Sequence, residues 1–174
     1  MHISQWFSVP AFDPDECDRA QEICNQETLT RTNLYKNCKV SWIRPDGINE
    51  WLYEKIDQLF TDVNKNTFRF KLDGELEPLQ YLEFGFGHYS EPQFDNGQDI
   101  TATRKMTMII QLTNTWHYGG GSVRIYGEKP KLYAPRERGH IAVFPSHLAH
   151  RSERIFYGKR RVLVAWKRGV QHLR

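Results

Sequence analysis

The spacing of hydrophobic residues changes near residue 67, and this change constrains the fold of the 174-residue chain more than any other feature. Residues 48–63 carry apolar side chains every three or four positions, which predicts an amphipathic helix. From residue 67 onward, short apolar runs are separated by turn residues such as Asp73-Gly74 and Asn96-Gly97, which predicts strands. A chain with helices first and many short strands afterwards is expected to form a β-sandwich or barrel with helices on one side.

An earlier helix is predicted directly after Asp13. The Asp13 side chain can cap it, Pro14 suits its first turn, and Glu16 completes a capping box. Residues 28–44 show a mixed pattern that favours no element. Strands are expected near the N-terminus before Pro10 and over residues 67–72, 78–84, 105–112, 122–126, 140–144 and 161–166.

The length suits one domain over residues 1–174, with a helical support region at 1–66 and a β core at 67–174. No apolar run approaches the roughly 20 residues needed to span a bilayer, and no signal-peptide pattern is visible at the start. A net charge of +3 is too small to indicate a nucleic-acid partner. The three cysteines form no Cys-x-x-Cys pair, which indicates reduced thiols and predicts a cytoplasmic protein.

The candidate functional residues lie on separate predicted strands. Asp95 offers a carboxylate and His150 an imidazole, which are the ligand types that hold non-haem Fe(II) with coordination positions left open. Gln93 stands two residues before Asp95, so in a strand both side chains face the same side. Arg160 follows on the next strand, where its guanidinium can bind a carboxylate.

Several short motifs follow one another through residues 79–169. In order, they are Phe84, Gly87 and Tyr89; Glu91-Pro92-Gln93-Phe94-Asp95; Arg104-Lys105-Met106-Thr107; Tyr118-Gly119-Gly120-Gly121; Gly139, Phe144, Ser146 and His150; and Gly158-Lys159-Arg160 before a strand that ends at Trp166. In order and spacing this series resembles the prolyl 4-hydroxylase-like branch of the 2-oxoglutarate- and Fe(II)-dependent dioxygenases. The resemblance implies a mostly β fold, a double-stranded β-helix (jelly roll) core with two supporting N-terminal helices.

The resemblance also implies roles for particular residues. Asp95 and His150 would bind Fe(II), and Arg160 would bind the distal carboxylate of 2-oxoglutarate. The reaction would use O2 to hydroxylate a C–H bond of a protein residue or a small molecule, with oxidative decarboxylation of 2-oxoglutarate.

Further residues are assigned to the pocket on the same basis. Thr107 and Gln111 share one face of their strand and are expected, with Phe84, to line the co-substrate pocket. Phe84 stands where many members carry tyrosine. Trp116 and Tyr118 are candidate substrate contacts, with rim or packing roles as the alternative.

The first metal histidine of the family pattern is Gln93 in this chain. Three hypotheses remain open from the sequence. The Gln93 amide oxygen completes the metal set; His88 replaces it after a loop rearrangement; or the site is degenerate and the fold serves as a catalytically silent binding module.

Overall fold

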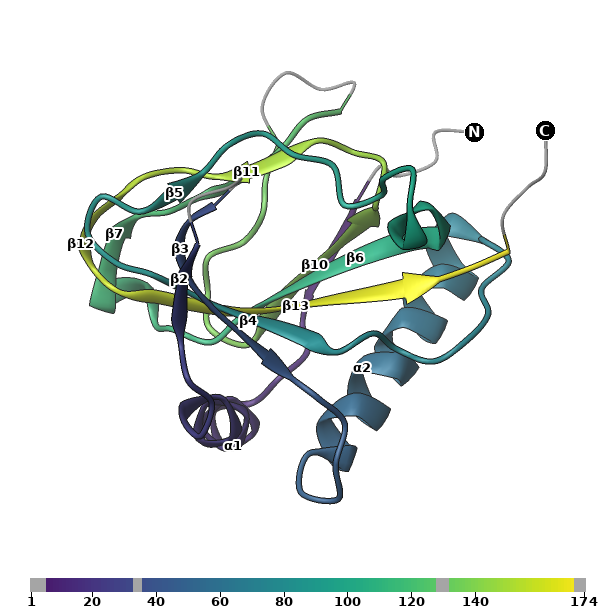
Figure 1. Cartoon of the computed structure of the whole chain (residues 1–174), viewed down its shortest axis with the longest axis horizontal. Coiled ribbons are helices and arrows are strands. Elements are labelled where there is room, and N and C mark those ends of the chain that lie inside the picture. The colour runs from purple at the N-terminus through teal and green to yellow at the C-terminus, as the bar shows by residue number, and fades with distance from the viewer. Residues whose placement is uncertain (1–5, 33–35, 128–131, 171–174) are drawn as a thin grey trace.

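The computed structural model describes residues 6–32, 36–127 and 132–170. Its largest element in this part of the chain is an antiparallel sheet of eight strands (Figure 1). Seven strands run in the spatial order β1 (Phe7–Pro10), β10 (His140–Pro145), β6 (Arg104–Gln111), β13 (Arg160–Arg168), β4 (Leu79–Phe84), β3 (Lys36–Ile43) and β2 (Thr30–Thr32), and β5 (Tyr89–Ser90) pairs with the start of β3.

Two smaller antiparallel sheets lie together on one side of the main sheet (Figure 1). One contains β11 (His150–Ser152), β8 (Val123–Ile125) and β9 (Leu132–Tyr133), and the other contains β12 (Ile155–Gly158) and β7 (Tyr118–Gly120). Short 3-10 helices, η2 (Ile100–Thr103) and η3 (Thr115–His117), precede β6 and β7. The double-stranded β-helix expected from the sequence is confirmed.

Helices α1 (Pro14–Asn25) and α2 (Glu50–Val63) cover the other side of the main sheet (Figure 1). The predicted capping box of α1 is present, because the Asp13 carboxylate accepts from the Glu16 N–H and the Glu16 carboxylate accepts from the Asp13 N–H. Neither α1 nor α2, nor any other helix among the described residues, has the length and hydrophobicity of a membrane span.

The strand predicted over residues 67–72 is wrong. The chain leaves α2 through a π-helical turn, η1 (Asn64–Phe68), which ends at Arg69 in the left-handed region with φ 59°. The alternating apolar residues there are partly buried against the helical core, and the rings of Phe68 and Phe70 stack with centroids 5.8 Å apart. Packing beside α2, rather than pairing in a sheet, explains their spacing.

The mixed segment over residues 28–44 proves to contain β2 and β3. Strand β3 pairs with β4 in the main sheet, and β1 pairs with β10. Residues 1–66 therefore supply strands to the main sheet, so a helical support region is an incomplete description of them.

Strand alternation gives the main sheet two apolar faces and the protein two cores. The face toward the helices carries, among others, Tyr81, Met106, Met108, Ile110, Val143 and Leu163. The opposite face packs against the smaller sheets and carries Phe84, Ile109, Phe144, Val162, Val164 and Trp166. Thr107 and Gln111 alternate with the helix-facing residues of β6, so both lie on the second face, where the candidate site is found.

Candidate active site

The three predicted metal-binding side chains converge on this second face. The Nε2 atom of His150 lies 3.5 Å from Asp95 Oδ2 and 3.5 Å from Gln93 Nε2. His150 and Asp95 are buried, and Gln93 is half-buried. One imidazole, one carboxylate and one amide therefore meet at a single point.

Backbone pairing sets this geometry. Gln93 and His150 form an antiparallel bridge in which each N–H donates to the other carbonyl, at 3.0 and 2.9 Å. The Asp95 N–H donates to Ser146 O over 3.1 Å. The Thr107 hydroxyl donates to Asp95 Oδ2 over 2.8 Å and lies 3.0 Å from Ser146 Oγ. Both the backbone and the carboxylate of Asp95 are thus held.

The His150 ring is oriented by its other nitrogen. Nδ1 lies 3.3 Å from the Leu148 carbonyl, which favours the tautomer that donates from Nδ1. That tautomer leaves the Nε2 lone pair directed toward Asp95 and Gln93. A histidine that binds a metal through one ring nitrogen usually donates a hydrogen bond from the other ring nitrogen.

Gln93 can present either end of its amide to this point. The nitrogen and oxygen of a glutamine amide are distinguished only by their contacts, and a half-turn places Oε1 where Nε2 stands. A carbonyl oxygen can ligate a divalent cation, although imidazole suits Fe(II) better. No group of three His, Cys, Asp or Glu residues in the described part of the chain could hold a metal. Gln93 is the amide side chain that lies next to His150 at this point.

A buried cation lies beside the metal-binding candidates. Arg160 is only 1% exposed; its Nε donates to Gln111 Oε1 and its Nη1 to Ser152 Oγ, each over 3.1 Å. Its Nη2 is buried without a hydrogen-bond partner. Gln111 reaches Arg160 because it pairs in register with Val162, two residues further along the same face of β13.

The charge of Arg160 is not neutralised by an acid. Burial lowers the pKa of Arg160 to about 10, so the side chain remains a cation near neutral pH. Among the described residues, no carboxylate lies within ion-pair distance of it. A buried cation with a free donor favours an anionic ligand, and the distal carboxylate of 2-oxoglutarate fits that requirement.

One cavity connects Arg160 with Gln93 and His150, whereas Asp95 does not line it. Its volume is about 20 Å³, and it is lined by Leu82, Phe84, Ser90, Gln93, Ile109, His150, Ser152, Arg160, Val162 and Val164. This volume holds about one water molecule, so lining side chains have to move when a molecule the size of 2-oxoglutarate binds.

The comparison with known families agrees with this geometry. The sequence model of the 2OG-Fe(II) oxygenase superfamily matches residues 79–168, just over half of the chain. The chain belongs to this superfamily. It is therefore an oxygenase that depends on Fe(II) and 2-oxoglutarate and uses O2 as co-substrate. A search of curated proteins finds no match.

Solved structures of prolyl hydroxylases share the fold of this oxygenase. A prolyl-4-hydroxylase of Pseudomonas putida superposes with a TM-score of 0.77 at 19% identity, covering 96% of this chain and 94% of that one. A prolyl hydroxylase of Trichoplax adhaerens, in complex with a hypoxia inducible factor peptide, gives 0.76 at 16%, covering 94% and 83%. The viral collagen prolyl hydroxylase of Paramecium Bursaria Chlorella virus-1, in complex with 2OG, gives 0.74 at 16%, covering 96% and 97%.

The other predicted pocket residues of the oxygenase fall into two groups. Gln111 and Phe84 lie against Arg160, whose Cζ is 5.5 Å from the centre of the Phe84 ring. Thr107 binds Asp95 and is absent from the cavity lining. Tyr118 is 1% exposed and its hydroxyl donates to the Arg136 carbonyl over 3.3 Å, whereas Trp116 is 72% exposed. Of the two candidate substrate contacts, Trp116 is the accessible one.

His88 is engaged in a local turn away from Gln93. It lies in the turn between β4 and β5, where its Nδ1 accepts from the Gly85 N–H over 3.0 Å. His88 is also absent from the lining of the cavity. The structure therefore gives no support to the hypothesis of a substitute histidine.

Sequence reasoning assigned no role to three residues that contact the site. Ser146 accepts the Asp95 N–H, Ser152 accepts from Arg160, and Arg104 donates from Nη1 to the Asp95 carbonyl over 3.2 Å. Ser146 and Arg104 belong to the motifs that carry the family resemblance, but no role in the site was assigned to either residue. Ser152 shares the face of His150 at i+2, a spacing that could have suggested it.

Proposed function

We propose that this oxygenase is a hydroxylase whose Fe(II) is held by the Gln93 amide oxygen, the Asp95 carboxylate and His150 Nε2. The observation that carries the proposal is the convergence of these three side chains beside the buried cation Arg160. The set corresponds to the two-histidine, one-carboxylate ligands of non-haem Fe(II) oxygenases, with one imidazole replaced by a neutral oxygen.

Arg160 supplies the binding and orientation of 2-oxoglutarate. Its Nη2, which has no hydrogen-bond partner in the structure, would donate to the distal carboxylate, while Gln111 and Ser152 hold the guanidinium in place. Ile109, Val162 and Val164 form the apolar part of the cavity wall. Bound Fe(II) supplies the activation of O2, and the overall reaction converts 2-oxoglutarate, O2 and R–H into succinate, CO2 and R–OH.

The substrate proposed first is a residue of a polypeptide, with a small molecule as the alternative. Support comes from the shared fold of prolyl hydroxylases, one of which is solved with a peptide. The exposed ring of Trp116, in η3 just before β7, offers an apolar surface for such a chain. A proline-containing peptide is therefore the first substrate to test.

Gln93 is expected to weaken metal binding without abolishing it. A neutral amide oxygen is a poorer donor to Fe(II) than an imidazole nitrogen, so the oxygenase should need a higher Fe(II) concentration than its Gln93→His variant. The Asp95 carboxylate still supplies the negative charge that balances the cation.

The test measures succinate formed from 2-oxoglutarate in the presence of Fe(II), O2 and a set of proline-containing peptides and small molecules. Wild-type protein, Gln93→His and His150→Ala are compared. Succinate formation by the wild type that rises with one substrate and is lost in His150→Ala supports the proposal. Succinate formed only by Gln93→His would favour the silent binding module instead, because the pocket would be intact and the chemistry absent.

A further inference from the structure

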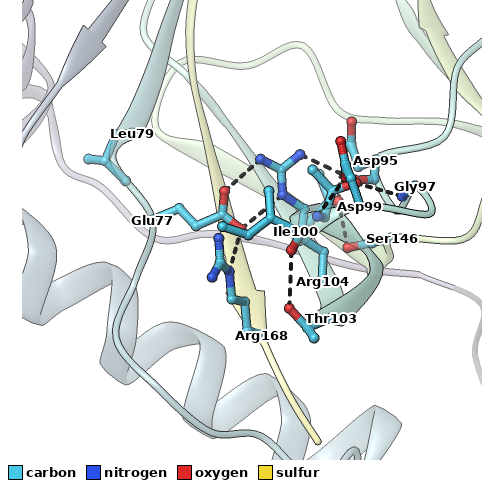
Figure 2. Close-up of polar contacts among 12 residues, drawn as sticks. Glu77, Leu79, Asp95, Gly97, Asp99, Ile100, Thr103, Arg104, Ser146 and Arg168 are labelled. Atoms are coloured by element: carbon cyan, nitrogen blue, oxygen red, sulfur yellow. Dashed lines mark hydrogen bonds and ion pairs between the residues drawn. The ribbon is translucent and has the colours of Figure 1, made fainter. Parts of the chain in front are cut away.

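The strongest unassigned cluster lies at the edge of the proposed metal site and is centred on Arg104 (Figure 2). Arg104 opens β6, directly after η2, and stands opposite Arg168 of β13. Its guanidinium lies 3.9 Å from the centre of the Trp166 ring. With the guanidinium placed over the ring, its N–H groups point outward in the guanidinium plane and can donate to neighbouring residues.

Those N–H groups join two distant segments. Nε and Nη2 of Arg104 donate to the two carboxylate oxygens of Glu77, at 2.9 and 2.5 Å. Nη1 donates to the Asp95 carbonyl over 3.2 Å. Figure 2 shows the guanidinium between Glu77 and Asp95. The Arg104 side chain is 13% exposed and the Glu77 side chain is 10% exposed, so this ion pair is largely sheltered from solvent.

The segment that carries Asp95 needs such support. Between β5 and η2 this segment forms no regular strand. An isolated β-bridge joins its Gln93 to His150. Beyond that bridge, Asp95 is fixed by Ser146 at its N–H, by Thr107 at its carboxylate and by Arg104 at its carbonyl. The contact from Arg104 restrains the peptide plane that follows the Asp95 Cα, and so the direction of the side chain.

We propose that Arg104 is a positioning residue, which holds the Asp95 carboxylate in the metal-binding direction through its hydrogen bond to the Asp95 carbonyl. Glu77, in the loop before β4, fixes the Arg104 side chain by a two-point ion pair. Because Arg104 belongs to β6, its hydrogen bond ties the position of Asp95 to the main sheet. The proposal rests on the proposed function, because it gives Asp95 the role of a metal ligand.

The chain offers a matched control. Arg168 also donates to Glu77, from Nε over 2.9 Å, but has no contact with Asp95 among the described interactions. Arg104→Lys keeps the charge and loses the fork that joins Glu77 to Asp95. Arg168→Lys loses a comparable contact with Glu77 and leaves the hydrogen bond to Asp95 in place.

Two readouts test the proposal, Co(II) titration without O2 and amide hydrogen exchange of Asp95 and Asn96, whose N–H groups both donate to Ser146 O. Loss of an outer contact to a metal ligand typically weakens metal affinity about 10- to 100-fold, and this is expected for Arg104→Lys but not for Arg168→Lys. Exchange of the two amides should accelerate only in Arg104→Lys, while the amides of β4 stay protected.

Equal Co(II) affinity in wild type and Arg104→Lys, or equal effects of both variants, would overturn the proposal. If the wild type itself binds no Co(II), the proposed metal site fails and amide exchange alone decides the role of Arg104. Selective acceleration at Asp95 and Asn96 then supports the positioning role, and unchanged exchange refutes it.

Discussion

Arg160 Nε donates to Gln111 Oε1 over 3.1 Å, while Gln111 Nε2 donates to the Pro135 carbonyl over 3.1 Å. The second contact fixes which end of the Gln111 amide faces Arg160. A neutral acceptor therefore orients a buried cation without neutralising its charge. Nη2 stays available, which is what an anion-binding site requires.

Replacing Arg160 is expected to weaken 2-oxoglutarate binding selectively. Arg160→Lys keeps the charge but loses the donor geometry, and a hydrogen bond to a charged group contributes about 1.5–3 kcal/mol, or roughly 10- to 150-fold in Kd. Calorimetric titration with 2-oxoglutarate and Mn(II) measures this change. Lys159→Gln, at an exposed neighbouring position, is the control and should bind like the wild type. Unaltered affinity in Arg160→Lys would remove Arg160 from the co-substrate site.

The Glu77 ion pairs predict a pH dependence of stability. Burial alone would raise the pKa of Glu77, but the hydrogen bonds and charges of Arg104 and Arg168 outweigh it and hold the pKa below its usual 4.5. Stability from this depressed pKa is present above pH 4.5 and is lost as the pH falls through the folded-state pKa. Glu77→Gln should therefore be less stable than wild type near neutral pH, by about 1–3 kcal/mol.

Urea unfolding over a range of pH values checks this expectation. The stability difference between wild type and Glu77→Gln should shrink as the pH falls below 4.5, because protonated glutamic acid then resembles glutamine. Glu75→Gln, at an exposed position in the same loop, should show no such trend. A difference that stays constant with pH would show that Glu77 acts through packing rather than charge.

Gly158 is expected to tolerate no side chain. It is the last residue of β12 and adopts φ +71°, and a Cβ there would lie 1.9 Å from the His117 carbonyl oxygen. Gly74 has nearly the same φ, +72°, but open space around its Cβ direction. Gly74→Ala should cost only the left-handed strain, about 1–2 kcal/mol, and Gly158→Ala should cost clearly more. Equal losses of thermal stability would mean that the backbone near His117 yields to the added methyl group.

Elements defined by local chemistry could be predicted from the sequence. The Asp13–Glu16 capping box and the apolar stripe of α2 depend on neighbouring residues, and both are found. Strand β3 was not predicted, because its pattern is shaped by tertiary contacts. Cys38, Val40 and Trp42 alternate there with Lys39 and Ser41, but the run is short. Its strand character depends on long-range pairing with β4, in which Lys39 stands opposite Glu83 with 3.8 Å between the charged atoms.

The candidate site likewise contains residues that could be placed from the sequence and residues that could not. The alternation of β6 placed Thr107 and Gln111 on the correct face. Gln93 and Asp95 lie close to His150 as expected, but they stand in an irregular segment and not in the strand that the i, i+2 spacing assumed. The contact between Arg104 and the Asp95 carbonyl was beyond sequence reasoning, because it depends on the path of an irregular loop. The partners of Arg160 depend likewise on the register between β6 and β13, which long-range pairing decides.

The most direct test of the account is an anaerobic Mn(II) titration of the wild type, Gln93→Leu and Gln93→His. Leucine matches the size of glutamine and removes the amide oxygen. Saturable binding is expected for the wild type, weaker binding for Gln93→Leu and tighter binding for Gln93→His, with 2-oxoglutarate strengthening all three. Equal affinity of wild type and Gln93→Leu, or binding by Gln93→His alone, would contradict ligation by Gln93.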